Sequence, residues 1–94
     1  MNKPFYTSAA QQDLAEIVSY IARDKPGAAL DWVAKIEAKC LLIAASPSLG
    51  ELQPHLGEGV RSSLVGRYVI FHRESSDRVE ILRVIGGDRD IRQL

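Results

Sequence analysis

Arginine is the only strongly basic residue in the last third of the chain. Residues 60–94 carry seven arginines and five carboxylates, a net charge of +2, whereas residues 1–59 carry five basic and seven acidic side chains, a net charge of −2. The planar guanidinium group binds a carboxylate or a phosphate through two parallel hydrogen bonds. This half of the chain therefore favours an anionic partner, although a solvated strand surface would carry the same residues. Because the whole chain is neutral, we expect no direct binding to nucleic acid, which normally needs a strongly basic face.

The sequence contains no arrangement of residues typical of catalysis or metal binding. His55 and His72 lie seventeen positions apart, without Cys, Asp or Glu at ligand spacing around them. Ser62-Ser63 lacks a recognisable His and Asp arrangement, and Gly57-Glu58-Gly59 is too short for a phosphate-binding loop. The single cysteine, Cys40, falls in an apolar stripe, which predicts a buried thiol. We therefore expect no catalytic residue, no metal and no cofactor.

The first half of the sequence predicts a short strand and two helices. After a strand over residues 4–7, Ser8 and Gln11 have the spacing of a capping box, so a helix should begin at Ser8. Pro26 suits the first position of a second helix, which Ser46-Pro47 stops. Each helix carries an apolar stripe at offsets of three and four. The first stripe is Ala10, Leu14, Ile17, Val18 and Ile21, with Gln12, Asp13, Glu16 and Ser19 facing away. The second is Ala29, Val33, Ile36, Cys40, Ile43 and Ala44, widened by Leu30, Leu41 and Leu42.

The second half predicts a surface loop and then a β-meander. Residues 47–59 contain two prolines and three glycines, and three β-branched and aromatic runs follow at 60–65, 67–73 and 78–85. The expected fold is a single α+β domain over residues 1–94, with an N-terminal strand and an antiparallel helix hairpin packed on an antiparallel sheet. The longest apolar run, residues 40–45, is too short to cross a membrane and no secretion signal is visible, so we expect a cytoplasmic protein without a membrane partner.

Strand pairing predicts which side chains share a face of the sheet. A turn centred on Ser75-Ser76 would pair Tyr68, Ile70 and His72 with Arg83, Ile81 and Val79. The other face would then carry Val69, Phe71, Leu82 and Val84. Both faces would be largely apolar, and two helices in so small a chain can cover only one of them. One face should therefore need a partner, unless the 47–59 loop and the C-terminal tail cover it.

The order of these elements and several motifs resemble the ParE branch of the RelE/ParE toxin superfamily over nearly the whole chain. The less specific motifs are Ser8-Ala9-Ala10 with Asp13-Leu14 and Glu16-Ile17, Tyr20-Ile21-Ala22 leading to Asp24 and Pro26-Gly27-Ala28-Ala29, and Ser46-Pro47 through Leu49-Gly50. The more specific ones are Gly66-Arg67-Tyr68-Val69-Ile70-Phe71-His72-Arg73, Val79-Glu80-Ile81-Leu82-Arg83-Val84-Ile85 and Arg89-Asp90-Ile91. They look like the closing strands and tail of that family. Many relatives differ in having Tyr at the position of His72 and His-Gly at that of Gly86-Gly87.

The resemblance implies a growth-inhibiting toxin that stabilises a plasmid or chromosome and needs no cofactor. It also implies that a ParD-like antitoxin encoded beside the toxin neutralises it by forming a hetero-oligomer. Characterised ParE-type toxins act on DNA gyrase, and such an inhibitor needs only a higher affinity for one state of its target. We expect three tail residues, Arg89, Asp90 and Arg92, to contact the target. From strand parity, we expect the antitoxin to contact Arg61, Tyr68, Ile70, His72, Val79, Ile81 and Arg83.

The alternative within the superfamily is a RelE-like ribonuclease that cleaves messenger RNA on the ribosome. Arg61 and Arg83 resemble in position two arginines of those enzymes, but arginine is a poor proton acceptor and no base accompanies them. Residues 53–59 also lack the lysines, and residues 86–94 the tyrosine, that RelE-like enzymes share. We therefore rank ribonuclease activity below gyrase inhibition. A binding module that has lost toxicity is a third hypothesis.

Overall fold

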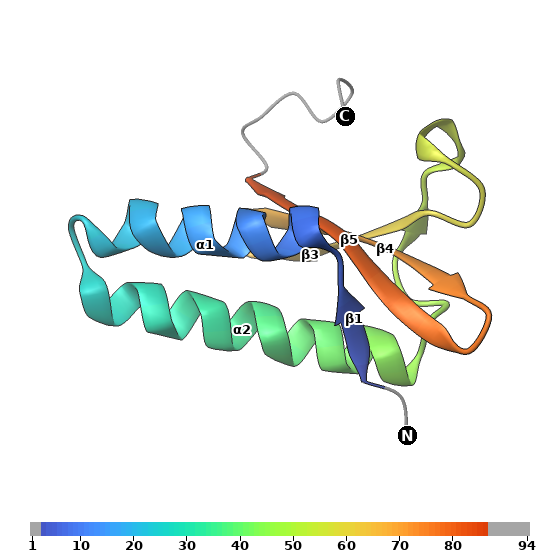
Figure 1. Cartoon of the computed structure of the whole chain (residues 1–94), viewed down its shortest axis with the longest axis horizontal. Helices are drawn as coiled ribbons and strands as arrows, with labels where there is room; N and C mark the ends of the chain where they lie inside the picture. The colour runs from blue at the N-terminus through green and yellow to red at the C-terminus, as the bar shows by residue number, and fades with distance from the viewer. Residues whose placement is uncertain (1–2, 87–94) are drawn as a thin grey trace.

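The computed structural model of the chain describes residues 3–86 and contains two helices on one face of a five-stranded sheet (Figure 1). The elements are β1 (Pro4–Tyr6), α1 (Ser8–Ala22), α2 (Pro26–Ala45), β2 (Glu51–Leu52), the short 3-10 helix η1 (Pro54–Leu56), β3 (Arg61–Val65), β4 (Tyr68–Ser75) and β5 (Arg78–Gly86). The strand order is β1-β5-β4-β3-β2, with β1 parallel to β5 and all other neighbours antiparallel. The predicted strand, helix hairpin and meander are confirmed, and the two short edge strands extend the meander at both sides.

The first helix begins at Ser8, as predicted, but its cap is not the predicted one. Thr7, not Ser8, is the N-cap, because its hydroxyl oxygen accepts a hydrogen bond from the backbone N–H of Ala10 at 3.1 Å. Gln11 does not close a capping box and instead donates to the carbonyl oxygen of Tyr6 at 3.0 Å. The cap therefore lies in the link between β1 and α1, where it fixes the direction in which the helix leaves the sheet.

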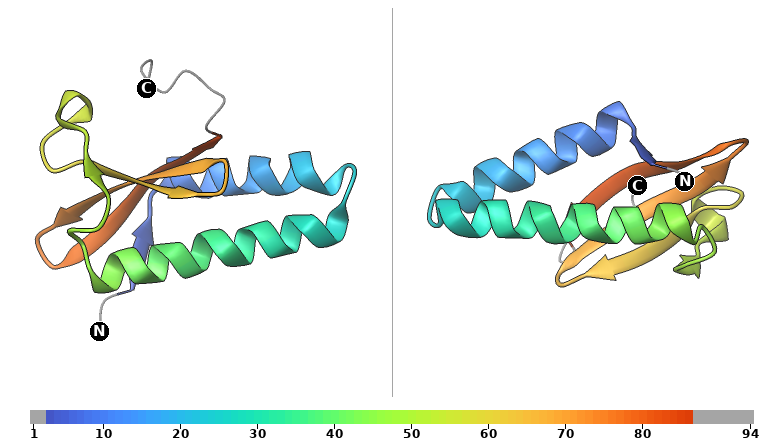
Figure 2. Two further views of the ribbon diagram at one scale, coloured as in Figure 1. Left: turned by 180° about the vertical axis from the view of Figure 1, so that it is seen from behind. Right: turned by 90° about the horizontal axis from the view of Figure 1, so that it is seen from below.

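The helix hairpin packs its inner side on the sheet, as Figure 2 shows from two further directions. Pro26 occupies the start of α2, as predicted. The main core joins both helices to β4 and β5 and consists of Ala10, Ile36, Cys40, Ile43, Ala44, Tyr68, Ile70, Val79, Ile81 and Val84. Neither of the described helices is long and apolar enough to span a membrane.

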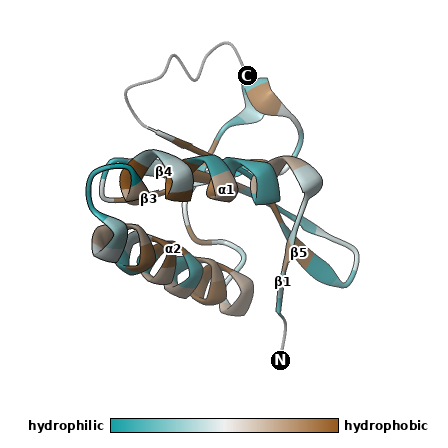
Figure 3. Cartoon of the chain, turned by 60° about the vertical axis from the view of Figure 1, so that its left-hand side comes forward, coloured by the Kyte–Doolittle hydropathy of each residue, from teal (hydrophilic) through white to brown (hydrophobic). Residues whose placement is uncertain are grey.

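The second helix is apolar on its outer side as well. Leu30, Leu41 and Leu42 were expected to widen the buried stripe, but they are 72%, 57% and 59% exposed. They lie on the side of α2 that faces away from the sheet, and Figure 3 shows the mixed hydropathy of this helix. The prediction was wrong because a helix resting on a flat sheet buries a stripe narrower than half of its circumference.

The register between β4 and β5 also differs from the prediction. The turn centres on Ser76-Asp77, where Ser76 adopts a φ of 45°, and a bulge between Phe71 and His72 shifts the pairing again. His72 therefore pairs with Ile81 and Phe71 with Arg83. The bulge reverses the alternation of β5, so Val84 faces the helices rather than the opposite side.

The loop between α2 and β3 covers the second face of the sheet. Val69, Phe71 and Ile85 are at most 6% exposed and form a small cluster with Val60, against which Leu56 of η1 and Leu82 pack. The expectation that one whole face would lie open for a partner is therefore wrong, and the alternative cover by the 47–59 loop is what the structure shows.

The turn between β3 and β4 is held against α2 by an aromatic contact. Trp32 meets Tyr68 edge to face, with ring centroids 5.3 Å apart and an interplanar angle of 72°. Gly66 in the turn has a φ of +58°, and a Cβ atom there would collide with the six-membered ring of Trp32. Only glycine meets both constraints.

We predict that Gly66→Ala lowers the free energy of unfolding by about 2 kcal/mol or more, since it adds a left-handed alanine and a collision in the same place. The control is Gly27→Ala in the first turn of α2, where a Cβ meets nothing within 4 Å. That change should be neutral or stabilising by up to about 1 kcal/mol. Urea denaturation measures the free energy of unfolding of both variants. Equal losses would contradict the requirement for glycine at position 66.

Candidate partner-binding cleft

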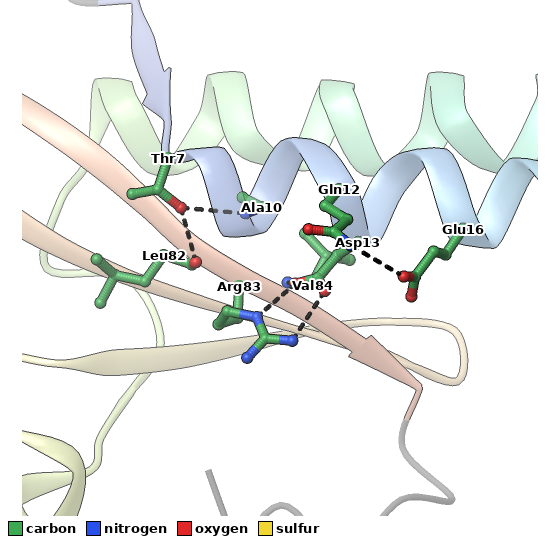
Figure 4. A network of polar contacts seen from close by, with 8 residues as sticks. All are labelled: Thr7, Ala10, Gln12, Asp13, Glu16, Leu82, Arg83 and Val84. Carbon is green, nitrogen blue, oxygen red and sulfur yellow. Dashed lines mark hydrogen bonds and ion pairs between the residues drawn. The ribbon is translucent and has the colours of Figure 1, made fainter.

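The most extensive polar contact between a helix and the sheet joins Asp13 of α1 to β5 (Figure 4). Arg83 donates to the two carboxylate oxygens of Asp13 through Nε at 2.7 Å and Nη2 at 2.9 Å. The backbone N–H of Val84 donates to the same carboxylate at 2.9 Å. The Asp13 side chain is 7% exposed, so a buried carboxylate receives three hydrogen bonds from one strand.

This contact defines what Arg83 can do. The hydrogen bonds that Arg83 donates to Asp13 raise the pKa of Arg83 above its ordinary value. Burial lowers this pKa, and the negative charges of Asp13 and Glu16 raise it. A guanidinium that is permanently charged and held in a bidentate pair can neither accept a proton nor swing freely toward a phosphate. Arg83 therefore has a structural role in this conformation.

Further hydrogen bonds join the same two elements at the start of α1. The Thr7 hydroxyl donates to the carbonyl oxygen of Leu82 at 2.9 Å while it caps α1, and the backbone N–H of Thr7 donates to Ile81 at 3.1 Å. Asp13 and Thr7 together hold α1 against β5 at two points. Asp13 was predicted to face away from the core, although its spacing of three from Ala10 and four from Ile17 would place it beside the apolar stripe.

A cleft of about 610 Å³ opens beside the Asp13–Arg83 pair, between α1 and the ends of β4 and β5. Its lining combines apolar surface from Ile17, Val84 and Ile85 with polar groups that include Asp13 and Glu16. Arg23 from the end of α1 and Arg67 from the β3–β4 turn also line it. Apolar surface with a few polar groups is the usual composition of a protein's binding site.

The two arginines of the cleft differ from the arginines of β4 and β5. Arg73 and Arg78 both pair with Glu80, at 3.7 and 3.4 Å, and Arg83 pairs with Asp13. Arg23 and Arg67 make no ion pair within the described residues. Tyr20, which is 69% exposed, lines the same cleft. The cleft thus joins two guanidinium groups and an exposed aromatic ring to apolar surface, a combination that suits a carboxylate-bearing apolar segment.

The structure covers most of the residues that strand parity had grouped for antitoxin binding. Five of them are covered by the protein itself, with exposed fractions of 7% or less: Tyr68, Ile70, His72, Val79 and Ile81. Four of these five belong to the main core beneath the helices, so they do not form a surface, and Tyr68 alone also lines the cleft. The physical reason is that the helix hairpin covers the very face that parity had assigned to a partner. Arg61 and Arg83 are partly exposed, but Arg61 donates to the carbonyl oxygen of Gly50 at 3.1 Å. The predicted target contacts Arg89, Asp90 and Arg92 lie outside the described residues.

His72 is the most deeply buried polar residue near the 47–59 loop. It is fully buried, and its Nε2 lies 3.3 Å from the carbonyl oxygen of Pro47, which can only accept a hydrogen bond. Nε2 therefore carries a proton, and Nδ1 has no partner among the described residues. Burial lowers the pKa of His72, the charge of Arg61 lowers it further, and hydrogen bonding to the backbone of Pro47 opposes this.

We predict that Asp13→Ala lowers the free energy of unfolding by about 2–4 kcal/mol, because it leaves the Val84 N–H and the Arg83 guanidinium without their acceptor. Asp31→Ala removes an exposed carboxylate from α2 and should change stability by less than about 0.5 kcal/mol. Chemical denaturation of both variants separates loss of this contact from loss of charge.

We predict that the protein loses stability as the pH falls below about 6.5, the ordinary pKa of histidine. A folded-state pKa below the unfolded value means that His72 favours folding fully above that pH and less as the pH falls toward the folded value. His72→Gln should remove this part of the pH dependence of the melting temperature. His55→Gln, at an exposed position, should keep it, and identical pH profiles for all three proteins would contradict the prediction.

Three comparisons place this architecture among known proteins. The model of the family "ParE toxin of type II toxin-antitoxin system, parDE" matches residues 5–91. Toxin ParE1 of Caulobacter vibrioides is 34% identical over 86 residues, which cover 88% of each chain. A chain of the chromosomal ParDE TA system from P. aeruginosa has the same fold, with a TM-score of 0.78, 22% identity and coverage of 92% of this chain and 96% of that one. A chain of the toxin-antitoxin complex RelBE2 from Mycobacterium tuberculosis gives a TM-score of 0.64, 23% identity and coverage of 93% of both chains. The chain belongs to the ParE family of toxins of type II toxin-antitoxin systems.

Proposed function

We propose that this toxin is neutralised by a ParD-like antitoxin that docks in the cleft between α1 and the sheet, and that it inhibits DNA gyrase by binding. The observation that supports the antitoxin site is the pairing of apolar surface with Arg23 and Arg67, which have no ion-pair partner within the described residues. Two of the solved structures with this fold are titled as toxin-antitoxin systems, which supports a protein partner of that kind.

The cleft selects the chemistry of the docking segment. An amphipathic segment would place apolar side chains over Ile17 and carboxylates beside Arg23 and Arg67. Charge-assisted pairs with arginine add both attraction and orientation. We propose a hetero-oligomer in the cytoplasm in which the antitoxin supplies this acidic, apolar segment.

Gyrase inhibition is proposed from family membership together with the absence of a visible catalytic group. Among the described residues no cluster of three metal-binding side chains occurs. An inhibitor that binds one state of its target more tightly than another shifts the target's equilibrium without any chemistry of its own. Growth inhibition, and through it plasmid or chromosome stabilisation, would follow from gyrase held in that state.

The ribonuclease alternative receives no support from the two arginines that suggested it. Arg83 is held by Asp13, and Arg61 donates to the backbone of Gly50. Neither is accompanied by a base: His72 is fully buried and donates toward Pro47. Ribosome-dependent cleavage of messenger RNA therefore ranks below gyrase inhibition.

We predict that the purified toxin blocks supercoiling of relaxed plasmid by DNA gyrase and that the antitoxin encoded beside it reverses the block. A double change in the cleft, Arg23→Glu with Arg67→Glu, should weaken antitoxin binding about tenfold or more, because both guanidinium contacts become repulsive. The control is Arg73→Glu, on the part of the sheet where arginine already pairs with Glu80.

Normal supercoiling at a large excess of toxin would remove gyrase as the target. Cuts in translated messages, detected by primer extension and lost in Arg83→Ala, would establish the ribonuclease instead. Unchanged antitoxin binding by the double variant would leave the gyrase assignment intact and overturn the proposed cleft.

A further inference from the structure

The outer edge of β3 is only half covered by its neighbour. β2 pairs with Arg61 and Ser62 and ends there, while β3 continues to Val65. Within the described chain no backbone hydrogen bond to residues 63–65 comes from this side. Val65 pairs with Tyr68 across the two-residue turn, which makes these two residues a hydrogen-bonded pair. Hydrogen-bonded and non-hydrogen-bonded pairs alternate along an antiparallel ladder. Leu64, the next residue, therefore directs its N–H and C=O groups away from β4 and toward the open edge.

The opposite edge of the sheet is better protected. β1 is three residues long and begins with Pro4, which has no N–H to offer. Its Phe5 ring is covered by the guanidinium group of Arg78, 3.8 Å from the ring centroid. Proteins usually protect edge strands with proline, charge, bulges or short length. Ser63, Leu64 and Val65 carry none of these features.

A shallow groove of about 440 Å³ runs along this open edge and has two chemically different sides. On the loop side it is lined by Leu64, which is 69% exposed, and by its cross-strand neighbour Val69. On the helix side it is lined by Lys39 of α2 and by Ser63. The Ser63 hydroxyl oxygen is buried and has no hydrogen-bond partner within the described residues. A buried hydroxyl of this kind is normally satisfied, so it suggests a missing acceptor.

We propose that this edge binds an extended peptide segment by strand addition, and that the segment alternates apolar and acidic residues. A strand that pairs with Leu64 would direct successive side chains to opposite sides of the sheet. Apolar side chains would then cover Leu64 and Val69. Carboxylates on the other side would meet Lys39 and accept a hydrogen bond from Ser63.

Further charges along the groove support an acidic segment with a defined position. Lys35 lies one turn before Lys39 on α2, and its Nζ is 4.8 Å from the centroid of the Trp32 ring. Because the Trp32 ring packs against Gly66, Lys35 lies at the Gly66 end of the edge. Glu51 lies at the other end, where β2 pairs with Ser62. The acidic residues of the segment should therefore lie toward Lys35 and Lys39 and away from Glu51.

A second copy of the chain fits this edge less well. Antiparallel pairing of β3 with β3 of another copy would place both α2 helices on the same side of one continuous sheet. Lys39 of one copy would then approach Lys39 of the other, and like charges brought together are unfavourable. An acidic strand from a different protein avoids this repulsion.

This site goes beyond the proposed function and does not depend on it. The groove lies at the β3 edge and shares no lining residue with the cleft beside α1. A toxin that fails to inhibit gyrase could still bind a strand here, and a toxin that inhibits gyrase could lack this binding.

The test is a titration of the ¹⁵N-labelled full chain with a capped octapeptide in which valine alternates with glutamate. We expect amide shifts that centre on Ser63–Val65 and Lys39, and at least about fivefold weaker binding by Lys39→Glu, because a favourable charge contact becomes repulsive. Leu64→Pro, which removes the N–H at the edge, should abolish the shifts. Lys25→Glu, in the exposed turn between the helices, should bind as the unchanged chain does, and a valine–lysine peptide should bind at least about fivefold more weakly.

Several results would overturn the proposal. They are the absence of shifts at millimolar peptide, shifts confined to the cleft beside α1, and equal binding by Lys39→Glu when its spectrum shows a folded chain. Edge shifts that depend on protein concentration without peptide would identify a second copy as the occupant. Since no step uses gyrase or an antitoxin, the outcome is independent of the supercoiling experiment.

Discussion

The fold depends on one buried carboxylate that ties the first helix to the last strand. Asp13 accepts hydrogen bonds from Arg83 and from the Val84 backbone, and residues seventy positions apart in the sequence are thereby joined. Because a buried charge is costly unless it is paired, this contact permits few alternative positions of α1 on the sheet. The position of α1 in turn shapes the cleft beside it, which Ile17 and Arg23 of the helix line together with residues at the end of β5.

The same contact restricts the chemistry that Arg83 can perform. Arg83 occupies a position that would suit phosphate stabilisation if the guanidinium were free, but here Asp13 holds it. Of the three described arginines without an ion pair, Arg61 donates to the backbone of Gly50, and Arg23 and Arg67 lie in the cleft beside apolar surface. That distribution suits recognition of an acidic protein segment better than the cleavage of RNA.

Much of the fold could be predicted from local patterns. The two helices, Pro26 as a helix start and the three-stranded meander follow from periodicity and turn residues, which act over a few positions. The bulge at Phe71 and His72 could not be predicted, because no residue signals it and a single inserted residue reverses which side chains of β5 face the helices. The burial of most of the predicted antitoxin contacts has a different cause: residues that share an apolar face are as consistent with a core as with a docking surface. The cover of the second face by Val60 and Leu56 arises from a loop without regular period.

Asp13 and Arg83 act as one structural unit, and a double-mutant cycle on stability measures their coupling. Asp13→Ala, Arg83→Ala and the double variant would be unfolded in urea under the same conditions. We expect a coupling free energy of about 1–3 kcal/mol, with the double variant losing less stability than the two single losses added together. Additive losses would contradict it, because they would mean that Arg83 does not depend on Asp13 for its contribution to the folded state.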